Sequence, residues 1–119
     1  MHERIRFIRH QSTQILLVDC SRCSAREVET SARTVPEYVT GQPRGSVLII
    51  TDFTGASFDR ETLRAMKESA VFDKPHVKKS ALVGTESLPA EFKKELEQFS
   101  RRELPAFASR GEALAWLVS

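Results

Sequence analysis

In the stretch Val47-Leu48-Ile49-Ile50, four apolar residues stand in a row, and three of them are β-branched. Such a short, uninterrupted run predicts a strand that is buried on both faces, as strands of parallel sheets are. Small hydroxyl residues and a glycine dominate residues 51–57, which predicts a loop. Next, Asp59 is placed to cap a helix, with Phe58 and Leu63 as its hydrophobic staple. The stretch therefore predicts a strand, a loop and a helix in succession.

The same unit occurs before and after this stretch. The apolar run Ile15-Leu16-Leu17-Val18 leads through residues 19–23 to a helix beginning at Ser24, which forms a capping-box pattern with Glu27. Later, Val77 to Val83 predicts another buried strand, followed by a loop and a third helix. The apolar face of that helix is expected to carry Leu88, Phe92, Leu96 and Phe99. Strands and helices that alternate in this way favour parallel pairing through right-handed crossovers.

The remaining segments complete the pattern. Arg4 to Arg9 alternates charged and apolar residues, which predicts an edge strand in a hairpin with the next apolar run. Pro36 lies late in the first helical pattern and Gly41 just beyond it, so the first helix should end or kink there, before the turn at residues 42–45. Leu104 to Phe107 predicts a short last strand, and Ser109 with Glu112 predicts a capped final helix. We therefore expect one α/β domain of 119 residues in the order β-β-α-β-α-β-α-β-α, a small, mostly parallel mixed sheet flanked by helices.

Three loops would meet at one edge of this sheet, because parallel strands end on the same side and the following helices begin there. The candidate binding residues in these loops are Asp19, Ser21, Asp52, Thr54, Gly55 and Thr85. Helix N-termini attract anions, and hydroxyl groups placed there can accept a phosphoryl group, although the two aspartates oppose a bound anion. The simpler alternative is that these side chains only cap helices.

The second of these loops, and several other segments, resemble a known family. Asp52-Phe53-Thr54-Gly55 after a buried strand is similar to the strand-Asp-Ser-Ser-Gly-helix element of STAS domains, which include the SpoIIAA-type anti-sigma-factor antagonists. The chain as a whole resembles the SpoIIAA-like group of STAS-like proteins of unknown function. The other shared segments are Leu17-Val18-Asp19, Thr51 to Ala56, Lys74-Pro75-His76-Val77, Ala81-Leu82-Val83-Gly84 and Glu112-Ala113-Leu114-Ala115-Trp116-Leu117.

The resemblance implies a STAS-like fold and a non-enzymatic regulatory or binding role. A protein partner or a small, apolar ligand would bind at the strand-end loops. Phe53 and Phe58 would be contacts there, although either ring can equally belong to the core. The antagonists of this family are phosphorylated on the serine directly after the aspartate, and Phe53 stands at that place here. Thr54 is then the alternative phosphoacceptor, in competition with a plain turn role.

The cysteines suggest a chemically different function. Cys20-Ser21-Arg22-Cys23 is a C-x-x-C motif between a strand and a helix, where a helix dipole lowers a thiol pKa. Cys20 and Cys23 would then make the chain a thiol redox protein. However, Asp19 replaces the aromatic residue that precedes such motifs in thioredoxin-like proteins, and Pro105 is the only candidate for the facing proline. We favour incidental cysteines of a cytosolic protein.

Composition and missing motifs argue against several other functions. With 18 basic and 16 acidic residues, the net charge of +2 is too balanced to attract nucleic acid. His2, His10 and His76 match no zinc motif, and no glycine-rich phosphate loop or hydrolase motif occurs, so we expect no metal or cofactor. No apolar run can span a membrane and the N-terminus is unlike a secretion signal, which predicts a cytoplasmic protein. Open sheet edges leave a homodimer, or a purely structural dimerisation module, as a third interpretation.

Overall fold

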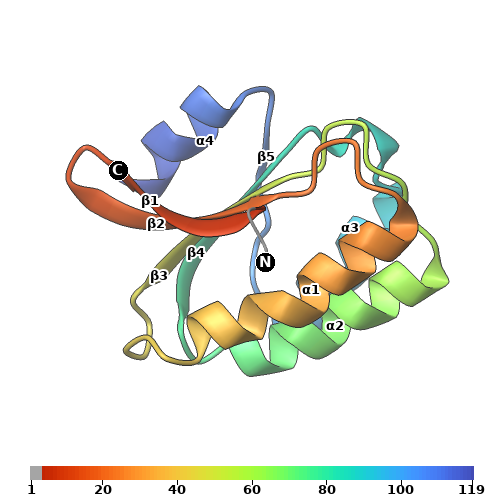
Figure 1. Cartoon of the computed structure of the whole chain (residues 1–119), viewed down its shortest axis with the longest axis horizontal. Helices are drawn as coiled ribbons and strands as arrows, with labels where there is room; N and C mark the ends of the chain where they lie inside the picture. The colour runs from red at the N-terminus through yellow and green to blue at the C-terminus, as the bar shows by residue number, and fades with distance from the viewer. Residues whose placement is uncertain (1–3) are drawn as a thin grey trace.

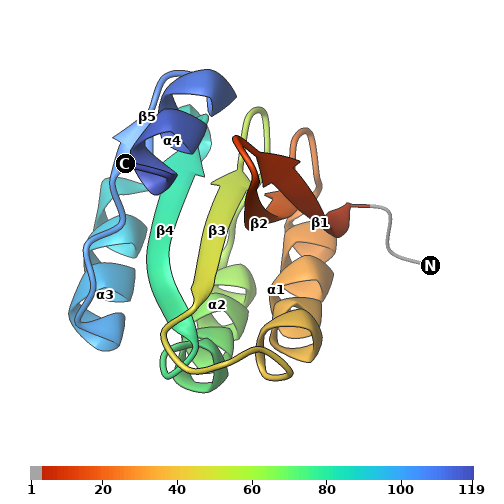
Figure 2. The same cartoon turned by 90° about the vertical axis from the view of Figure 1, so that its left-hand side faces the viewer.

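Five strands form one sheet in the order β1-β2-β3-β4-β5 in the computed structural model, which describes residues 4–119 (Figures 1 and 2). β1 is antiparallel to β2, and each later neighbouring pair is parallel. This arrangement confirms the expected α/β fold and its order of elements. The bounds are β1 Ile5–His10, β2 Thr13–Asp19, α1 Ala25–Val39, β3 Val47–Asp52, α2 Arg60–Asp73, β4 Val77–Val83, the 3₁₀ turn η1 Thr85–Ser87, α3 Ala90–Ser100, β5 Ala106–Phe107 and α4 Arg110–Leu117.

Helices cover both faces of the sheet. Figure 2 shows α4 in front of the sheet and α1, α2 and α3 behind it. Successive side chains of a strand point to opposite faces, so Leu16 and Val18 of β2 join the core under α1–α3, whereas Ile15 and Leu17 join the core under α4. Two separate apolar cores explain why the central strands are uninterrupted apolar runs.

The three predicted helix starts are confirmed. The Ser24 side chain accepts a hydrogen bond from the Glu27 backbone, and Glu27 returns the bond, which completes the expected capping box. Asp59 caps α2 in the same way, with Thr62 as the returning residue. Ser109 caps α4 by accepting a hydrogen bond from the Glu112 backbone at 3.2 Å.

The first helix ends at Val39, between Pro36 and Gly41 as expected, with Pro36 inside its last turns. A proline removes one hydrogen bond from a helix interior. Here the turn beyond it is retained because Val35 and Val39 are both buried in the core under α1–α3. In addition, the Pro36 carbonyl accepts hydrogen bonds from the backbone and the hydroxyl group of Thr40, at 3.0 and 2.8 Å.

Two expectations for the C-terminal half need correction. Leu88 precedes α3 rather than lying on it, and Phe99 is 48% exposed instead of buried. The ring of Phe99 lies 6.0 Å from the ammonium group of Lys67 on α2, a surface contact rather than a core contact. The last strand is also shorter than expected and comprises only Ala106–Phe107.

Candidate functional site

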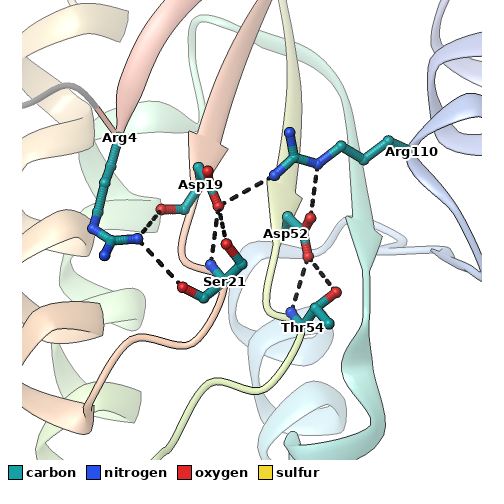
Figure 3. A network of polar contacts seen from close by, with 6 residues as sticks. All are labelled: Arg4, Asp19, Ser21, Asp52, Thr54 and Arg110. Carbon is teal, nitrogen blue, oxygen red and sulfur yellow. Dashed lines mark hydrogen bonds and ion pairs between the residues drawn. The ribbon is translucent and has the colours of Figure 1, made fainter.

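Asp19 and Asp52 end the neighbouring parallel strands β2 and β3 and lie directly opposite each other in the register. Each carboxylate accepts hydrogen bonds from the residue two positions after it in the chain (Figure 3). Asp19 Oδ1 accepts hydrogen bonds from the backbone and hydroxyl group of Ser21, at 3.1 and 2.6 Å. Asp52 Oδ1 accepts the same two bonds from Thr54, at 2.9 and 2.6 Å. The two loops therefore begin with the same turn, side by side.

Arg110 joins these two turns. It is the first residue of α4, and its guanidinium lies between the carboxylates, with Nε 2.7 Å from Asp52 Oδ2 and Nη2 3.2 Å from Asp19 Oδ1 (Figure 3). The Asp52 side chain is only 8% exposed, so its charge requires such a partner. Arg110 was not among the site residues expected from the sequence. The sequence pointed to Arg110 only through the predicted last strand. Because this strand pairs in parallel with β4, the helix α4 that follows it begins at this edge.

Both carboxyl groups are acidic in the folded protein. Burial alone raises the pKa of Asp19 and of Asp52, but hydrogen bonds from Ser21 and Thr54 and the charge of Arg110 outweigh it. The pKa of each therefore lies below its ordinary value. At neutral pH the edge carries two carboxylates with one guanidinium between them.

The predicted gathering of three loops at one edge is observed. The backbone of Cys20 donates to the Asp52 carbonyl at 2.8 Å, and the backbone of Phe53 donates to the Val83 carbonyl at 2.8 Å. The Ser87 hydroxyl group donates to the Ala56 carbonyl at 2.6 Å, which ties the third loop to the second. The guanidinium of Arg4, just before β1, donates to the carbonyls of Asp19 and Ser21 in the first loop. The three loops form one hydrogen-bonded surface.

The candidate residues differ in their exposure. Thr54 and Gly55 are exposed, whereas Ser21 and Thr85 are half-buried. The ring of Phe53 is 4% exposed and packs edge-on against Phe58, with ring centroids 5.0 Å apart. Phe58 is partly buried against the same core. Of the two phenylalanines, Phe58 is therefore the more accessible from solvent.

Cys20 and Cys23 are free thiols, and both are buried. Burial raises the pKa of Cys20 to about 12, and the nearby Cys23 adds to this effect. Burial also raises the pKa of Cys23. A redox-active C-x-x-C motif needs an exposed thiol with a lowered pKa, so both observations oppose the redox function.

The remaining expectations concern metals and membranes. Within residues 4–119, no group of three or more His, Cys, Asp or Glu side chains is placed to hold a metal ion. His10 ends β1, and His76 lies in the turn before β4 with Nδ1 2.8 Å from the Gln42 carbonyl oxygen, while His2 lies outside the described residues. None of the helices that the structure describes is long and apolar enough to cross a membrane.

Replacing Arg110 with methionine should destabilise the protein at pH 7 by about 1 to 2 kcal/mol, because two facing carboxylates lose their shared counter-charge. This range lies well below that for fully buried ion pairs, since the Arg110 side chain is 40% exposed. The loss should shrink as the pH falls, because carboxyl groups with lowered pKa values stabilise the fold only while they are ionised. Urea unfolding at several pH values would measure this change.

Arg33→Met is the matched control for this prediction. Arg33 also contacts two carboxylates, those of Glu29 and Glu68, but on an exposed helix surface. Its removal should cost clearly less than the removal of Arg110. Equal losses in the two variants would show that Arg110 is an ordinary surface charge.

Comparisons with known proteins support the fold and leave the function open. No protein-family model matches the sequence, and no curated protein matches it. Among solved structures, the chain is similar to an anti-sigma-factor antagonist (STAS) domain protein from Planctomyces limnophilus, with a TM-score of 0.58 and 17% sequence identity. The similarity covers 97% of this chain and 98% of the other. The chain thus has a STAS-like fold, as the sequence resemblance implied.

Proposed function

We propose that this chain is a non-enzymatic regulatory module that binds a protein partner at its strand-end edge. We define this edge as the three loops 19–23, 52–57 and 84–87. The observation that carries the proposal is that the Arg110 guanidinium contacts both Asp19 and Asp52. It thereby joins the two aspartate turns, which have the same hydrogen bonds, into one surface. A surface that is already ordered loses little conformational entropy when a partner binds. The printed description of the similar structure, an anti-sigma-factor antagonist domain, also favours a regulatory partner.

The chemistry of the edge favours a macromolecular partner over catalysis. Asp19 and Asp52 have lowered pKa values and are occupied by hydrogen bonds and Arg110, so neither is suited to act as a general base near neutral pH. The side chains that a partner can contact are the exposed ones of these loops, among them Ser57 and Glu86. Exposed groups on a rigid base suit the broad, shape-dependent contact that a protein makes.

Thr54 is the candidate phosphoacceptor of this edge. It is exposed, and its hydroxyl group donates to Asp52 at 2.6 Å. A phosphoryl group on that oxygen would remove the hydrogen bond and place further negative charge beside a carboxylate. Phosphorylation would therefore disturb the turn and weaken partner binding, which is how a regulatory module can be switched.

Photo-crosslinking would test which surface the partner contacts. A photoreactive amino acid at Ser57 or Glu86 should capture the same protein, because both positions are exposed at the edge. The same amino acid at Arg44, exposed in the turn before β3 at the opposite end of the sheet, is the matched control and should capture nothing. Capture from Arg44 alone would overturn the proposed surface. Capture of a second copy of this chain would instead support the dimerisation module.

Thr54→Glu should weaken binding of the captured partner by at least about tenfold, or about 1.4 kcal/mol. The introduced carboxylate lies beside Asp52 and cannot donate the hydrogen bond that Thr54 makes. Thr54→Ser keeps the hydroxyl group and should bind as the wild type does. Titration calorimetry would measure both variants, and equal affinity for Thr54→Glu and the wild type would exclude Thr54 from the contact.

The cytoplasmic location expected from the sequence stays a prediction.

A further inference from the structure

A cavity of about 150 Å³ lies between the sheet and helices α1–α3. Its walls are mainly apolar, with Val28 of α1, Ile49 of β3, Leu82 of β4 and Leu96 of α3 among them. Cavities of this volume with apolar walls are large enough to hold a benzene ring. The sheet separates this space from α4 (Figure 1).

The polar residues of the cavity include a group from the ends of α2 and α3. Asp73 and Lys74 come from the end of α2, and Ser100 and Arg102 from the end of α3. Arg102 Nη2 donates to the Lys74 carbonyl at 3.4 Å and Nη1 to the Lys78 carbonyl at 3.0 Å, which joins the two helix ends. This end lies away from the strand-end edge, since α2 starts near that edge and runs back along the sheet (Figure 2).

Among the described residues, one carboxylate oxygen at this end has no hydrogen-bond partner. Asp73 Oδ2 accepts a hydrogen bond from the Ser69 hydroxyl group at 2.9 Å, whereas Asp73 Oδ1 is buried and has no hydrogen-bond partner within residues 4–119. A buried polar atom without a partner costs about 1 to 3 kcal/mol, and more when it is charged. A ligand that supplied a donor at this point would remove that cost.

We propose that this cavity binds a small, apolar molecule carrying one hydrogen-bond donor, a hydroxyl or protonated amine group, which donates to Asp73 Oδ1. The volume limits the apolar part to about one six-membered ring. The carbonyl end of a helix is electronegative, so the C-terminus of α2 further favours a donor and disfavours an anion. This site is distinct from the strand-end edge and does not depend on the function proposed for it.

Titrations monitored by NMR would test the ligand class with three ring compounds of similar size. Phenol carries a donor, toluene carries none, and benzoate is an anion. At pH 7.5, phenol should shift the backbone amides of Val28, Ile49 and Leu82 and bind at least tenfold more tightly than toluene, while benzoate should leave them unshifted. Equal affinities for phenol and toluene, or shifts confined to other residues, would overturn the proposal.

Two variants locate the donor contact and the cavity. Asp73→Leu removes the acceptor with little change in size, so phenol should bind no more tightly than toluene. Ala70→Leu fills part of the cavity, so both compounds should lose affinity. Glu61→Leu, exposed in the first turn of α2, is the control and should bind phenol as the wild type does. Retained preference for phenol in Asp73→Leu would exclude the proposed contact.

Discussion

Replacing Gly84 with alanine should destabilise the folded protein by about 2 to 5 kcal/mol, the sum of a backbone penalty and a steric penalty. Gly84 follows β4 with φ of +66°, in the left-handed region that residues with a side chain rarely adopt. A Cβ atom at this position would lie 2.1 Å from Thr54 Oγ1 and 2.7 Å from both Thr54 Cα and Thr54 N. Real Cβ atoms do not approach backbone so closely, so one of the two loops must move.

The strand-end edge cannot absorb this movement without loss. Thr54 is held by two hydrogen bonds to Asp52, whose carboxylate is held in turn by Arg110. Moving Thr54 away from Gly84 would therefore disturb the turn that we propose as the partner-binding surface. We expect Gly84→Ala to lose partner binding as well as stability.

Gly45→Ala is the matched control, because Gly45 has nearly the same φ, +64°, but apart from its own chain neighbours no residue of the described range 4–119 comes within 4 Å of the added Cβ. It should cost only the backbone penalty, about 1 to 2 kcal/mol. Urea unfolding at pH 7 would compare the two variants. If they lost equal stability, the close approach of Thr54 to Gly84 would have no energetic weight.

The fold could be predicted because its signals are local. Ser24 with Glu27, and Asp59 alone, mark helix starts within a few residues of sequence, and each was found where expected. Uninterrupted apolar runs similarly distinguish strands buried on both faces from half-exposed ones. The sequence could not fix the last residue of α1 between Pro36 and Gly41, because the local cost of Pro36 is offset by the buried Val39, a contact that comes from the tertiary structure.

The candidate site could be predicted only in part. The positions of Asp19 and Asp52 followed from strand order, because residues at the ends of neighbouring parallel strands must lie together. Arg110 is far along the chain from both, and its approach depends on a last strand of only two residues. The isolation of Asp73 Oδ1 is similar, since in the sequence Asp73 is merely a polar residue at a helix end. Long-range contacts such as these leave no periodic pattern in the sequence.

Asp73→Asn should change how stability depends on pH. Burial raises the pKa of Asp73 from 3.8 to about 6, against the opposing effects of the Ser69 hydrogen bond and the His76 charge. Two other cations lie nearby: Lys74 is the next residue in the chain, and Arg102 directs its guanidinium to the backbone carbonyls of Lys74 and Lys78. Burial nevertheless has the largest effect on the Asp73 pKa. The carboxyl group is therefore harder to ionise in the folded protein than in the unfolded chain.

The sign of the effect follows from which state holds the proton more tightly. Below pH 3.8 both states are protonated, and the Asp73 contribution to stability is fully present. As the pH rises towards 6, the unfolded chain loses its proton first, so the wild type loses up to about 3 kcal/mol. Asparagine has no proton to lose, so the stability of Asp73→Asn relative to the wild type should rise by about that amount between pH 3.5 and 7.

Urea unfolding of the wild type and Asp73→Asn across this pH range would measure the difference, and Asp52→Asn provides a contrast of opposite sign. The pKa of Asp52 is lowered, so its charge stabilises the fold at neutral pH and Asp52→Asn should lose stability relative to the wild type as the pH rises. If the free energies of unfolding of the wild type and Asp73→Asn changed with pH in the same way, the Asp73 carboxylate would be solvated. The cavity would then lack the acceptor on which its proposed ligand depends.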